Sequence, residues 1–367
     1  MNDTLTSGSA AASGSGLLEF EKPLLQIQQL IAEMERAQRD DSKDLAAELK
    51  QQRARYKTTL RRLYTNLTPW ETVLVARHSK RPLVTDYLTT IFRDVCELHG
   101  DRAFGDDRAI ITAFARIGPH RVMVVGQNKG RDIKERVNCN FGCAHPEGYR
   151  KAMHKMRLAE KYALPVVCLI DTQGAYPGIG AEERGIHYAI AKSMMDMSRL
   201  RTPIVSIVIG EGGSGGALGL GVADRVAMLQ HAFYSVISPE GCAAILWKTA
   251  EKRKHAAEAL KLVSKELLTL NLIDDVIAEP VGGAHRDPEA TVAGVEQYVV
   301  STLTELRRFT PESLVSKRQD RLRKLGAFFE SPSETAAAEQ AARARGSTTR
   351  ASRVRSRLTA PTRVPVP

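Results

Sequence analysis

The sequence IVSIVIGEGGSGGA at residues 204–217 decides the fold class of this chain. Residues 204–209 are almost entirely apolar and mostly β-branched, which predicts a buried strand. Five of the next seven residues, 210–216, are glycine, and glycine lets backbone amides approach a ligand closely because it has no Cβ. Amides at the start of a helix also carry partial positive charge, which suits a phosphate, a carboxylate or a developing oxyanion. The stretch therefore predicts a strand–loop–helix unit that binds negative charge through its main chain.

A second unit of the same kind lies about 38 residues earlier in the chain. The apolar run VVCLID at 166–171 leads into TQGAYPGIG at 172–180. Repeats of strand, loop and helix are typical of an α/β protein with a parallel sheet and right-handed crossovers. A glycine–proline pair between the β-rich runs 109–117 and 121–127 predicts a hairpin. Paired strands before the helices favour a spiral of strand–strand–helix turns over a plain doubly wound sheet.

Further elements are predicted on both sides of these two units. Leucine and isoleucine recur at three- and four-residue spacing through 17–67, which predicts a helical hairpin. Thr68, Pro69 and Glu71 then mark a capped helix start. In the body of the chain we expect helices at 146–163, at 184–200 and from Pro239, and short strands at 225–229 and 233–236.

Composition divides the chain into four parts. Residues 1–16 are a Ser/Gly/Ala/Thr-rich lead and are predicted to be disordered. Residues 17–80 form the N-terminal helical region, and 81–325 the catalytic body. Residues 331–367 hold seven arginines against two glutamates and almost no large apolar residues, so a disordered basic tail is predicted. This tail accounts for part of the formal net charge of +11, and we expect it to be solvated rather than to bind nucleic acid.

The overall composition is that of a globular protein, with 43% hydrophobic and 26% charged residues. No stretch approaches the roughly 18 apolar residues of a membrane span. The N-terminus lacks the basic and apolar regions of a secretory signal. Five cysteines, an odd number, favour free thiols in a reducing compartment. We therefore expect a cytoplasmic protein without a membrane partner.

Three short patterns in the sequence point to chemistry that the rest of the chain does not support. Residues 210–215 match the dinucleotide pattern G-x-G-x-x-G, but no acidic residue stands at 228–236, where that fold would place one. Residues 212–216 match the serine-hydrolase pattern G-x-S-x-G, but no histidine downstream stands in a triad context. Cys139, Cys143 and His145 are close in sequence, yet zinc needs a second ligand cluster, so we expect no metal in this chain.

The remaining interpretation is stabilisation of an anion by main-chain donors. The amides of Gly215 and Gly216 are consecutive and begin the predicted helix, so both can point at one oxygen. A packing role for the glycines is the structural alternative. Five glycines in seven residues exceed what close packing of a helix on a sheet requires.

Several segments together resemble the α subunits of the bacterial-type acetyl-coenzyme A carboxylase carboxyltransferase, over roughly residues 17–325. The segments are KGR at 129–131, PEGYRKA at 146–152, GAYPG at 174–178, GAEERG at 180–185, the glycine stretch 210–218, YSVISPEGCA at 234–243 and GGAHR at 282–286. Their length and order make the resemblance specific.

The resemblance implies a crotonase-like (ClpP/crotonase) α/β fold. It implies transfer of a carboxyl group from N-carboxybiotin, carried on a biotin carboxyl carrier protein, to acetyl-CoA, which gives malonyl-CoA for fatty acid synthesis. The implied partners are a β subunit with a zinc ribbon, in an α2β2 tetramer, and a biotin carboxylase. Zinc is expected in the β subunit, and ATP is used only at the biotin carboxylase step.

The resemblance also assigns roles to residues. It implies that the amides of Gly215 and Gly216 hold the negative charge on the biotin ureido oxygen, whose neighbouring nitrogen then takes a proton from the acetyl methyl group. Residues expected to bind substrate are Gly212, Gly213, Gly174, Ala175, Tyr176, Gly178, Lys129 and Arg131. For Lys129 and Arg131, an equally good interpretation is that they are solvent-exposed charges without a role in binding. The chain departs from the family at Gln173, where proline is usual, and at Ile186-His187.

Three other functions stay open on the sequence. The chain could serve another biotin-dependent acyl-CoA carboxylase or decarboxylase, because the acyl-binding half lies mostly in the partner. A crotonase-type hydratase would need catalytic glutamates facing the amides, and none is placed convincingly. A nucleic-acid binder would depend on the basic tail, whereas the transferase predicts near-normal turnover without residues 331–367.

Overall fold

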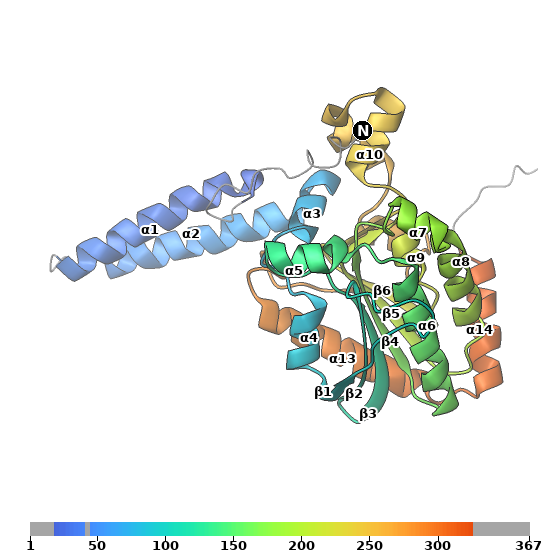
Figure 1. Ribbon diagram of the computed structural model, residues 1–367. Coiled ribbons are helices and arrows are strands. Elements are labelled where there is room, and N and C mark those ends of the chain that lie inside the picture. The colour runs from blue at the N-terminus through green and yellow to red at the C-terminus, as the bar shows by residue number, and fades with distance from the viewer. Residues whose placement is uncertain (1–17, 41–44, 326–367) are drawn as a thin grey trace, which may run out of the picture. The chain divides into compact units, whose positions relative to one another are not determined.

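The computed structural model describes residues 18–40 and 45–325, whose strands form one mixed sheet of eight (Figure 1). The order is β1-β2-β3-β4-β5-β6-β8, and β7 pairs with β5 outside this path. The pairs β1–β2 and β2–β3 are antiparallel, and all other pairs are parallel. The strands are β1 Arg93–Glu97, β2 Ile110–Ile117, β3 His120–Gln127, β4 Val166–Thr172, β5 Ile204–Gly213, β6 Arg225–Leu229, β7 Phe233–Ser235 and β8 Asp275–Ile277.

Fourteen α-helices and three short 3₁₀ helices accompany the sheet in the described residues. The first seven α-helices are α1 Lys22–Asp40, α2 Ala46–Thr65, α3 Pro69–Ala76, α4 Val84–Thr90, α5 Ile133–Asn138, α6 Pro146–Lys161 and α7 Ile179–Glu183. The others are α8 Ile186–Met197, α9 Ser214–Leu218, α10 Pro239–Trp247, α11 Arg253–Ala259, α12 Ser264–Thr269, α13 Pro288–Leu306 and α14 Pro311–Arg323. The 3₁₀ helices are η1 Glu19–Glu21, η2 Asn140–Gly142 and η3 Ala250–Lys252.

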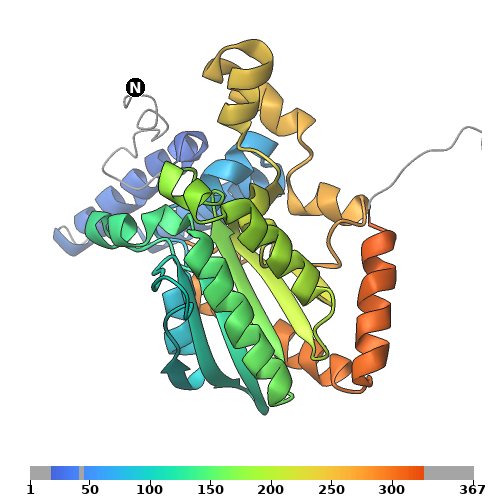
Figure 2. The ribbon, with the colours of Figure 1, turned by 45° about the vertical axis from the view of Figure 1, so that its right-hand side comes forward.

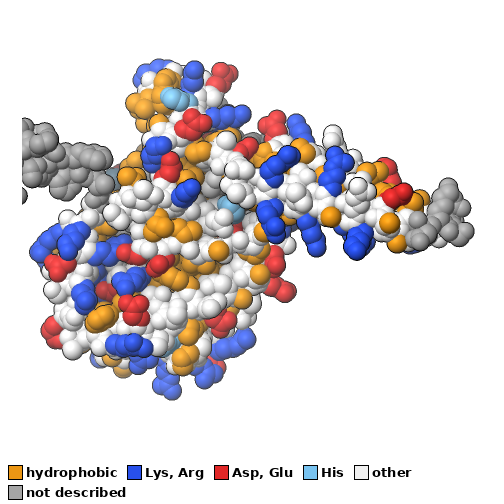
Figure 3. Space-filling view, turned by 180° about the vertical axis from the view of Figure 1, so that it is seen from behind, with side chains coloured by type: hydrophobic (Ala, Val, Ile, Leu, Met, Phe, Trp, Pro, Cys, Tyr) orange, Lys and Arg blue, Asp and Glu red, His pale blue; other side chains and the backbone are white. Residues whose placement is uncertain are grey.

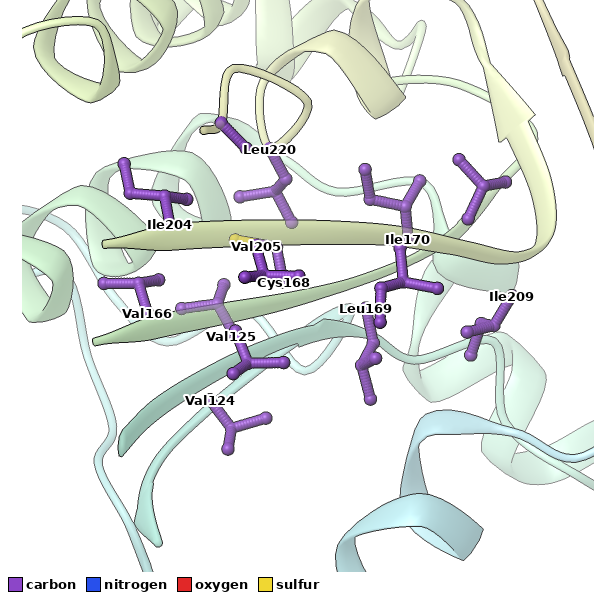
Figure 4. Close-up of a cluster of buried hydrophobic side chains, with 14 of the residues drawn as sticks. Val124, Val125, Val166, Cys168, Leu169, Ile170, Ile204, Val205, Ile209 and Leu220 are labelled. Carbon is purple, nitrogen blue, oxygen red and sulfur yellow. The ribbon is translucent and has the colours of Figure 1, made fainter. Parts of the chain in front are cut away.

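The core lies on both faces of the central parallel strands. Helices α6 and α8 cover one face of the sheet, and α13 lies on the other (Figure 2). Strands β4 and β5 are buried along their whole length, because a parallel sheet covered by helices exposes neither face. Figure 4 shows side chains of β3, β4 and β5 packed together, among them Val125, Leu169 and Val205.

A bulge in β5 ends its regular pairing with β4 beside Asp171. Ile170 pairs with Val208, but Thr172 pairs with Gly212, so two additional residues of β5 lie between these pairs. The Asp171 carboxylate accepts a hydrogen bond from the amide of Glu211 at 2.8 Å in place of a ladder partner. A Cβ on Gly210 would stand 2.6 Å from Asp171 Oδ1, so glycine is needed there to admit the carboxylate.

The predicted helical hairpin is confirmed as α1 and α2. It joins the body where the Arg286 guanidinium pairs with Glu21 and donates to the Tyr56 hydroxyl at 3.0 Å. Glu21 also accepts from the Tyr64 hydroxyl at 2.9 Å. The surface of α2 is strongly basic, as the arm in Figure 3 shows. Its exposed cations are Lys50, Arg53, Arg55, Lys57, Arg61 and Arg62.

Several other predicted elements are confirmed. The capping box at Thr68 is present, with Thr68 accepting from the Glu71 amide and Glu71 accepting in return. The hairpin of β2 and β3 turns through Gly118, whose φ of +50° favours glycine. The helix expected at 146–163 is α6, and the short strands are β6 and β7.

Two predictions need correction. The helix expected at 184–200 is confirmed as α8, Ile186–Met197, but the loop expected at 172–180 ends in a further short helix, α7 at Ile179–Glu183, which Gly185 separates from α8 with a left-handed φ of +77°. The glycine-rich loop expected at 210–217 is mostly not a loop, since β5 continues through Gly213 and α9 begins at Ser214. The predicted lead at 1–16 and tail at 331–367 lie outside the described residues. No helix in the described ranges has the length and apolar character needed to cross a bilayer.

Candidate active site

The two glycine-rich stretches meet at the carboxyl ends of the neighbouring parallel strands β4 and β5. A Cβ on Gly213 would stand 2.0 Å from the Gln173 carbonyl oxygen. A Cβ on Gly216 would stand 2.4 Å from the Gly174 carbonyl carbon and 2.6 Å from the Ala175 nitrogen. The backbones are therefore closer than any side chain permits, and glycine is required at both positions.

The predicted amide donors lie at the start of the five-residue helix α9. Gly213 caps this helix in an extended conformation, and Ser214 follows with a φ of +51°. Within residues 18–40 and 45–325, no atom accepts a hydrogen bond from the amide of Gly215 or Gly216. Gly215 is partly exposed and Gly216 is buried. Two consecutive amides in the first turn of this helix therefore have no hydrogen-bond partner among the described residues.

The loop after β4 is held by the hydroxyl of Thr172. The one hydrogen of this hydroxyl is shared between the Gly142 and Gly174 carbonyls, at 2.7 and 2.8 Å from the oxygen, and the oxygen accepts from the Gly174 amide at 3.1 Å. Further along the loop, the Tyr176 ring stacks on His145 with a centroid distance of 4.0 Å. A Cβ on Gly178 would stand 2.4 Å from the Tyr176 ring, so any larger residue at 178 would clash with the ring in this position.

Lys129 lies beneath the two stretches in a buried network of charges. Its ammonium contacts Asp171 Oδ1 at 2.7 Å and Glu211 Oε1 at 2.5 Å. Glu211 also binds Arg77 at 2.7 Å, and Arg77 reaches Glu240 at 2.6 Å. Burial acts to raise the pKa of Glu211, but the two cations lower it to about 2. The network therefore ties the ends of β3, β4 and β5 to α3 and α10.

The predicted site residues thus fall into three groups. Gly174, Ala175, Gly213 and Gly216 come together in space, with Gly215 beside them, and Tyr176 and Gly178 follow on the same loop. Gly212 is buried in β5, where a Cβ would stand 2.9 Å from the Tyr234 ring. Arg131 is exposed and pairs with Asp86 at 2.5 Å; its contacts among the described residues do not reach either glycine stretch.

Sequence reasoning missed the carboxylates of this network. Asp171 closes an apolar strand and Glu211 is the one charged residue within a glycine stretch, and a lone charge in such surroundings is a signal that predicts a buried pair. Of the departures from the family, Gln173 and His187 are exposed and Ile186 is buried, and His187 pairs with Glu182 at 3.0 Å on the surface. All five cysteines are free thiols, and the described part of the chain contains no group of His, Cys, Asp or Glu arranged to hold a metal.

Exposed apolar side chains, here called the apolar rim, lie on the segments that follow the carboxyl ends of the strands. Helices α5, α7, α9 and α10 follow the carboxyl ends of β3, β4, β5 and β7, so all four lie at one edge of the sheet (Figure 1). The segments at this edge expose large apolar side chains, including Ile133 at 81%, Ile179 at 78% and Val236 at 74%. Others are Val137, Phe141, Tyr188, Leu218, Ile245 and Leu246. Exposed large apolar side chains concentrated at one edge of a sheet are typical of a protein–protein interface.

Comparison with known proteins decides the family. The family model described as "Acetyl co-enzyme A carboxylase carboxyltransferase-like" matches residues 17–326. The chain belongs to this family. It is 53% identical over 318 residues to the acetyl-coenzyme A carboxylase carboxyl transferase subunit alpha of Rhodopirellula baltica, covering 87% of this chain and 99% of the relative. The corresponding subunit of Thermus thermophilus is 50% identical over 313 residues, covering 85% and 99%.

Solved structures similar to this carboxyltransferase-family chain are more distant. The transcarboxylase 12S structure is 22% identical with a TM-score of 0.48, covering 60% of this chain and 42% of that one. The Pseudomonas malonate decarboxylase MdcD–MdcE heterodimer is 16% identical with a TM-score of 0.49, covering 60% and 89%. Family membership confirms the predicted α/β crotonase-like fold class, and the strand–strand–helix units β2-β3-α6 and β6-β7-α10 agree with it.

Proposed function

We propose that this chain is the alpha subunit of the carboxyltransferase component of acetyl-CoA carboxylase. In this role it transfers the carboxyl group of N-carboxybiotin, presented on the biotin carboxyl carrier protein, to acetyl-CoA and so produces malonyl-CoA. Family membership over residues 17–326 supports the proposal. The structural observation that supports it best is the pair of unpartnered amides at Gly215 and Gly216, at the junction of two glycine stretches.

The catalytic role proposed for the chain is electrostatic. N-Carboxybiotin supplies an activated carboxyl group, and its ureido oxygen gains negative charge as that group leaves. The amides of Gly215 and Gly216 donate hydrogen bonds to this oxygen. One such donor is worth about 2.7–4 kcal/mol of transition-state stabilisation, because a fixed dipole in a dry site needs no reorganisation. No side-chain base of this chain is then required.

The substrate-binding role is proposed for the loop after β4 and its surroundings. Gly174, Ala175, Tyr176 and Gly178 form the wall opposite the donor amides, and the buried Gly212 and Gly213 set the end of β5 behind them. Lys129 and Arg131 are proposed to favour an anionic substrate. Arg131, which is exposed, can exchange Asp86 for such a group, whereas Lys129 already binds two buried carboxylates and acts on substrate only through the position of the network.

The proposed partners follow from the same assignment. The apolar rim formed by Ile133, Ile179, Val236 and their neighbours is proposed to bind the β subunit, which carries zinc and most of the coenzyme A site in an α2β2 tetramer. The biotin carboxyl carrier protein and biotin carboxylase complete the enzyme, with ATP consumed only at the carboxylase step. The five free thiols support a cytoplasmic location.

The direct experiment is co-expression with a zinc-ribbon β subunit. The purified pair is assayed for acetyl-CoA formation from malonyl-CoA and a biotin analogue. The corresponding formation of propionyl-CoA from its carboxylated form is measured in parallel. Each subunit assayed separately is the control, and activity is expected only in the pair. A stable pair that transfers no carboxyl group with either acyl-CoA would refute the proposal. Preference for the larger acyl group would identify another biotin-dependent acyl-CoA carboxylase.

A further inference from the structure

The buried side chain of Gln127 connects the two glycine stretches. Gln127 is the last residue of β3 and is 1% exposed. Its Nε2 donates to the Gly216 carbonyl at 2.8 Å, and its Oε1 accepts from the Asp171 amide at 3.1 Å. One partner is an acceptor and the other a donor, so only one orientation of the side-chain amide satisfies both. The two bonds join the end of β4 to the first turn of α9.

The Gly216 carbonyl needs such a partner because α9 is short. A carbonyl near the end of a helix lacks an intrahelical donor, and the Leu220 amide, which would otherwise bind it, donates to Ala217 at 3.1 Å. Besides Gln127, the buried hydroxyl of Tyr149 donates to the Gly216 carbonyl at 3.2 Å. Side chains from β3 and α6 thus replace the helix bonds that a longer α9 would provide.

We propose that Gln127 is a positioning residue that fixes the peptide group joining Gly216 to Ala217, and through it the direction of the donor amides in the two peptide groups that precede it. The inference rests on the proposed function. Glycine has the widest backbone freedom of any residue, so two adjacent glycines do not hold their amides in one direction without external bonds. Oxyanion donors act only when they are held within about 0.5 Å of the productive geometry. Gln127 supplies this restraint at the carbonyl of the donor residue, and Tyr149 adds a second bond.

The test measures turnover in the reconstituted αβ complex with Gln127→Met and Gln127→Glu. Methionine keeps the length of the side chain and removes both bonds. Glutamate keeps the acceptor for the Asp171 amide and replaces the donor with an oxygen facing the Gly216 carbonyl. Both variants are expected to lower kcat by about 10- to 100-fold with KM for malonyl-CoA changed less than about threefold, since a misplacement near 1 Å costs up to about 100-fold.

A matched control is Ser206→Ala, which removes a buried hydroxyl that donates to the Leu220 carbonyl at 2.7 Å, just beyond α9. It removes the same kind of bond without touching Gly216, and its kcat should stay within about twofold of the wild type. Tyr149→Phe, which removes one atom, should lower kcat less than Gln127→Met. If Gln127→Met does not fold, the kcat values of Gln127→Glu and Tyr149→Phe are compared with that of Ser206→Ala instead.

A second readout separates this inference from the proposed function. Gln127→Met should raise the hydrogen-exchange rate of the peptide containing Gly215, Gly216 and Ala217, whereas Ser206→Ala should not. The inference would be overturned if the wild-type complex is active and the folded Gln127 variants show the same kcat and the same exchange rate as the wild type. That result would leave the carboxyltransferase assignment intact. An inactive wild-type complex would refute the assignment, and the exchange measurement would still decide the role of Gln127.

Discussion

The backbone of Gly216 packs directly against the backbone of Gly174, at a separation where a Cβ on Gly216 would stand 2.4 Å from the Gly174 carbonyl carbon. These residues belong to the two repeated strand–loop–helix units of the chain. Their contact makes the loop after β4 and the first turn of α9 one surface. The geometry of the amide donors therefore depends on both units, and neither can shift without the other.

The two donor glycines should respond differently to alanine. Gly216→Ala places its Cβ inside the Gly174 backbone, and overpacking of this kind typically costs about 1–3 kcal/mol. In Gly215→Ala the nearest atom is Ile190 Cδ1 at 3.6 Å, an ordinary contact. We expect Gly216→Ala to lower kcat at least about tenfold and to lower Tm, and Gly215→Ala to leave Tm unchanged. Steady-state kinetics and calorimetry check both.

The donor role itself is tested at Gly215, where there is space for a side chain. Gly215→Pro removes the amide hydrogen, and the first turn of a helix tolerates proline. Loss of one donor predicts a fall in kcat of about 10²–10³-fold relative to Gly215→Ala. Equal kcat in the two variants, with the αβ complex intact by gel filtration, would refute the assignment of this amide.

Ser214 stores backbone strain at the start of α9. Its φ of +51° lies in the left-handed region, which costs a residue with a Cβ roughly 1–2 kcal/mol. Ser214→Gly should raise the free energy of unfolding by about 1 kcal/mol in urea titrations, after allowance for the greater freedom of glycine in the unfolded chain. Ser214→Ala keeps the strain and serves as the control. A Ser214→Gly variant no more stable than Ser214→Ala would contradict the prediction.

Lys129 and Arg131 were both predicted to bind substrate, but their surroundings predict different effects of mutation. Lys129→Met leaves Asp171 and Glu211 buried without their shared cation, and breaking such a pair costs about 3–5 kcal/mol. Arg131→Ala removes an exposed pair with Asp86, worth about 0–1 kcal/mol. Urea unfolding and the KM for malonyl-CoA should be measured for both variants. A substrate role for Arg131 requires a higher KM at unchanged stability.

His285 should make the fold sensitive to acid. Its ring stacks on His78 at 4.0 Å and lies beside the Tyr64 hydroxyl. Burial, followed by nearby positive charges, lowers the pKa of His285 to about 3. The unfolded chain binds this proton near pH 6.5, so the stabilisation is complete above pH 6.5 and is lost as pH falls toward 3.

The pH prediction is tested by urea unfolding at pH 7 and pH 5. Between these values His285→Gln should lose about 2 kcal/mol less stability than the wild type, by proton linkage. The exposed His187→Gln variant is the control and should follow the wild type. Parallel losses in wild type and His285→Gln would show that His285 is protonated in the folded state at pH 5.

Local patterns were sufficient for most of the elements. The apolar runs at 166–171 and 204–209 became β4 and β5 because continuous apolar strands fit only a sheet covered on both faces. The hairpin at 109–127 and the capping box at Thr68 depend on residues within a few positions of one another, so their signals are visible in the chain. The short helix α7 was missed because five residues directly after a glycine–proline loop are too few to show a helical period.

The amino-acid sequence determined the class of fold, the family and the two glycine stretches at which charge can be held, because these depend on residue type and short-range order. Only the folded chain decided how those stretches work. The 2.4 Å approach at Gly216, the ion pairs of Lys129 and the bridge made by Gln127 join residues about 40 to 90 positions apart. Such contacts form when separate strands are brought to one edge of a sheet, and no local propensity of the chain specifies them.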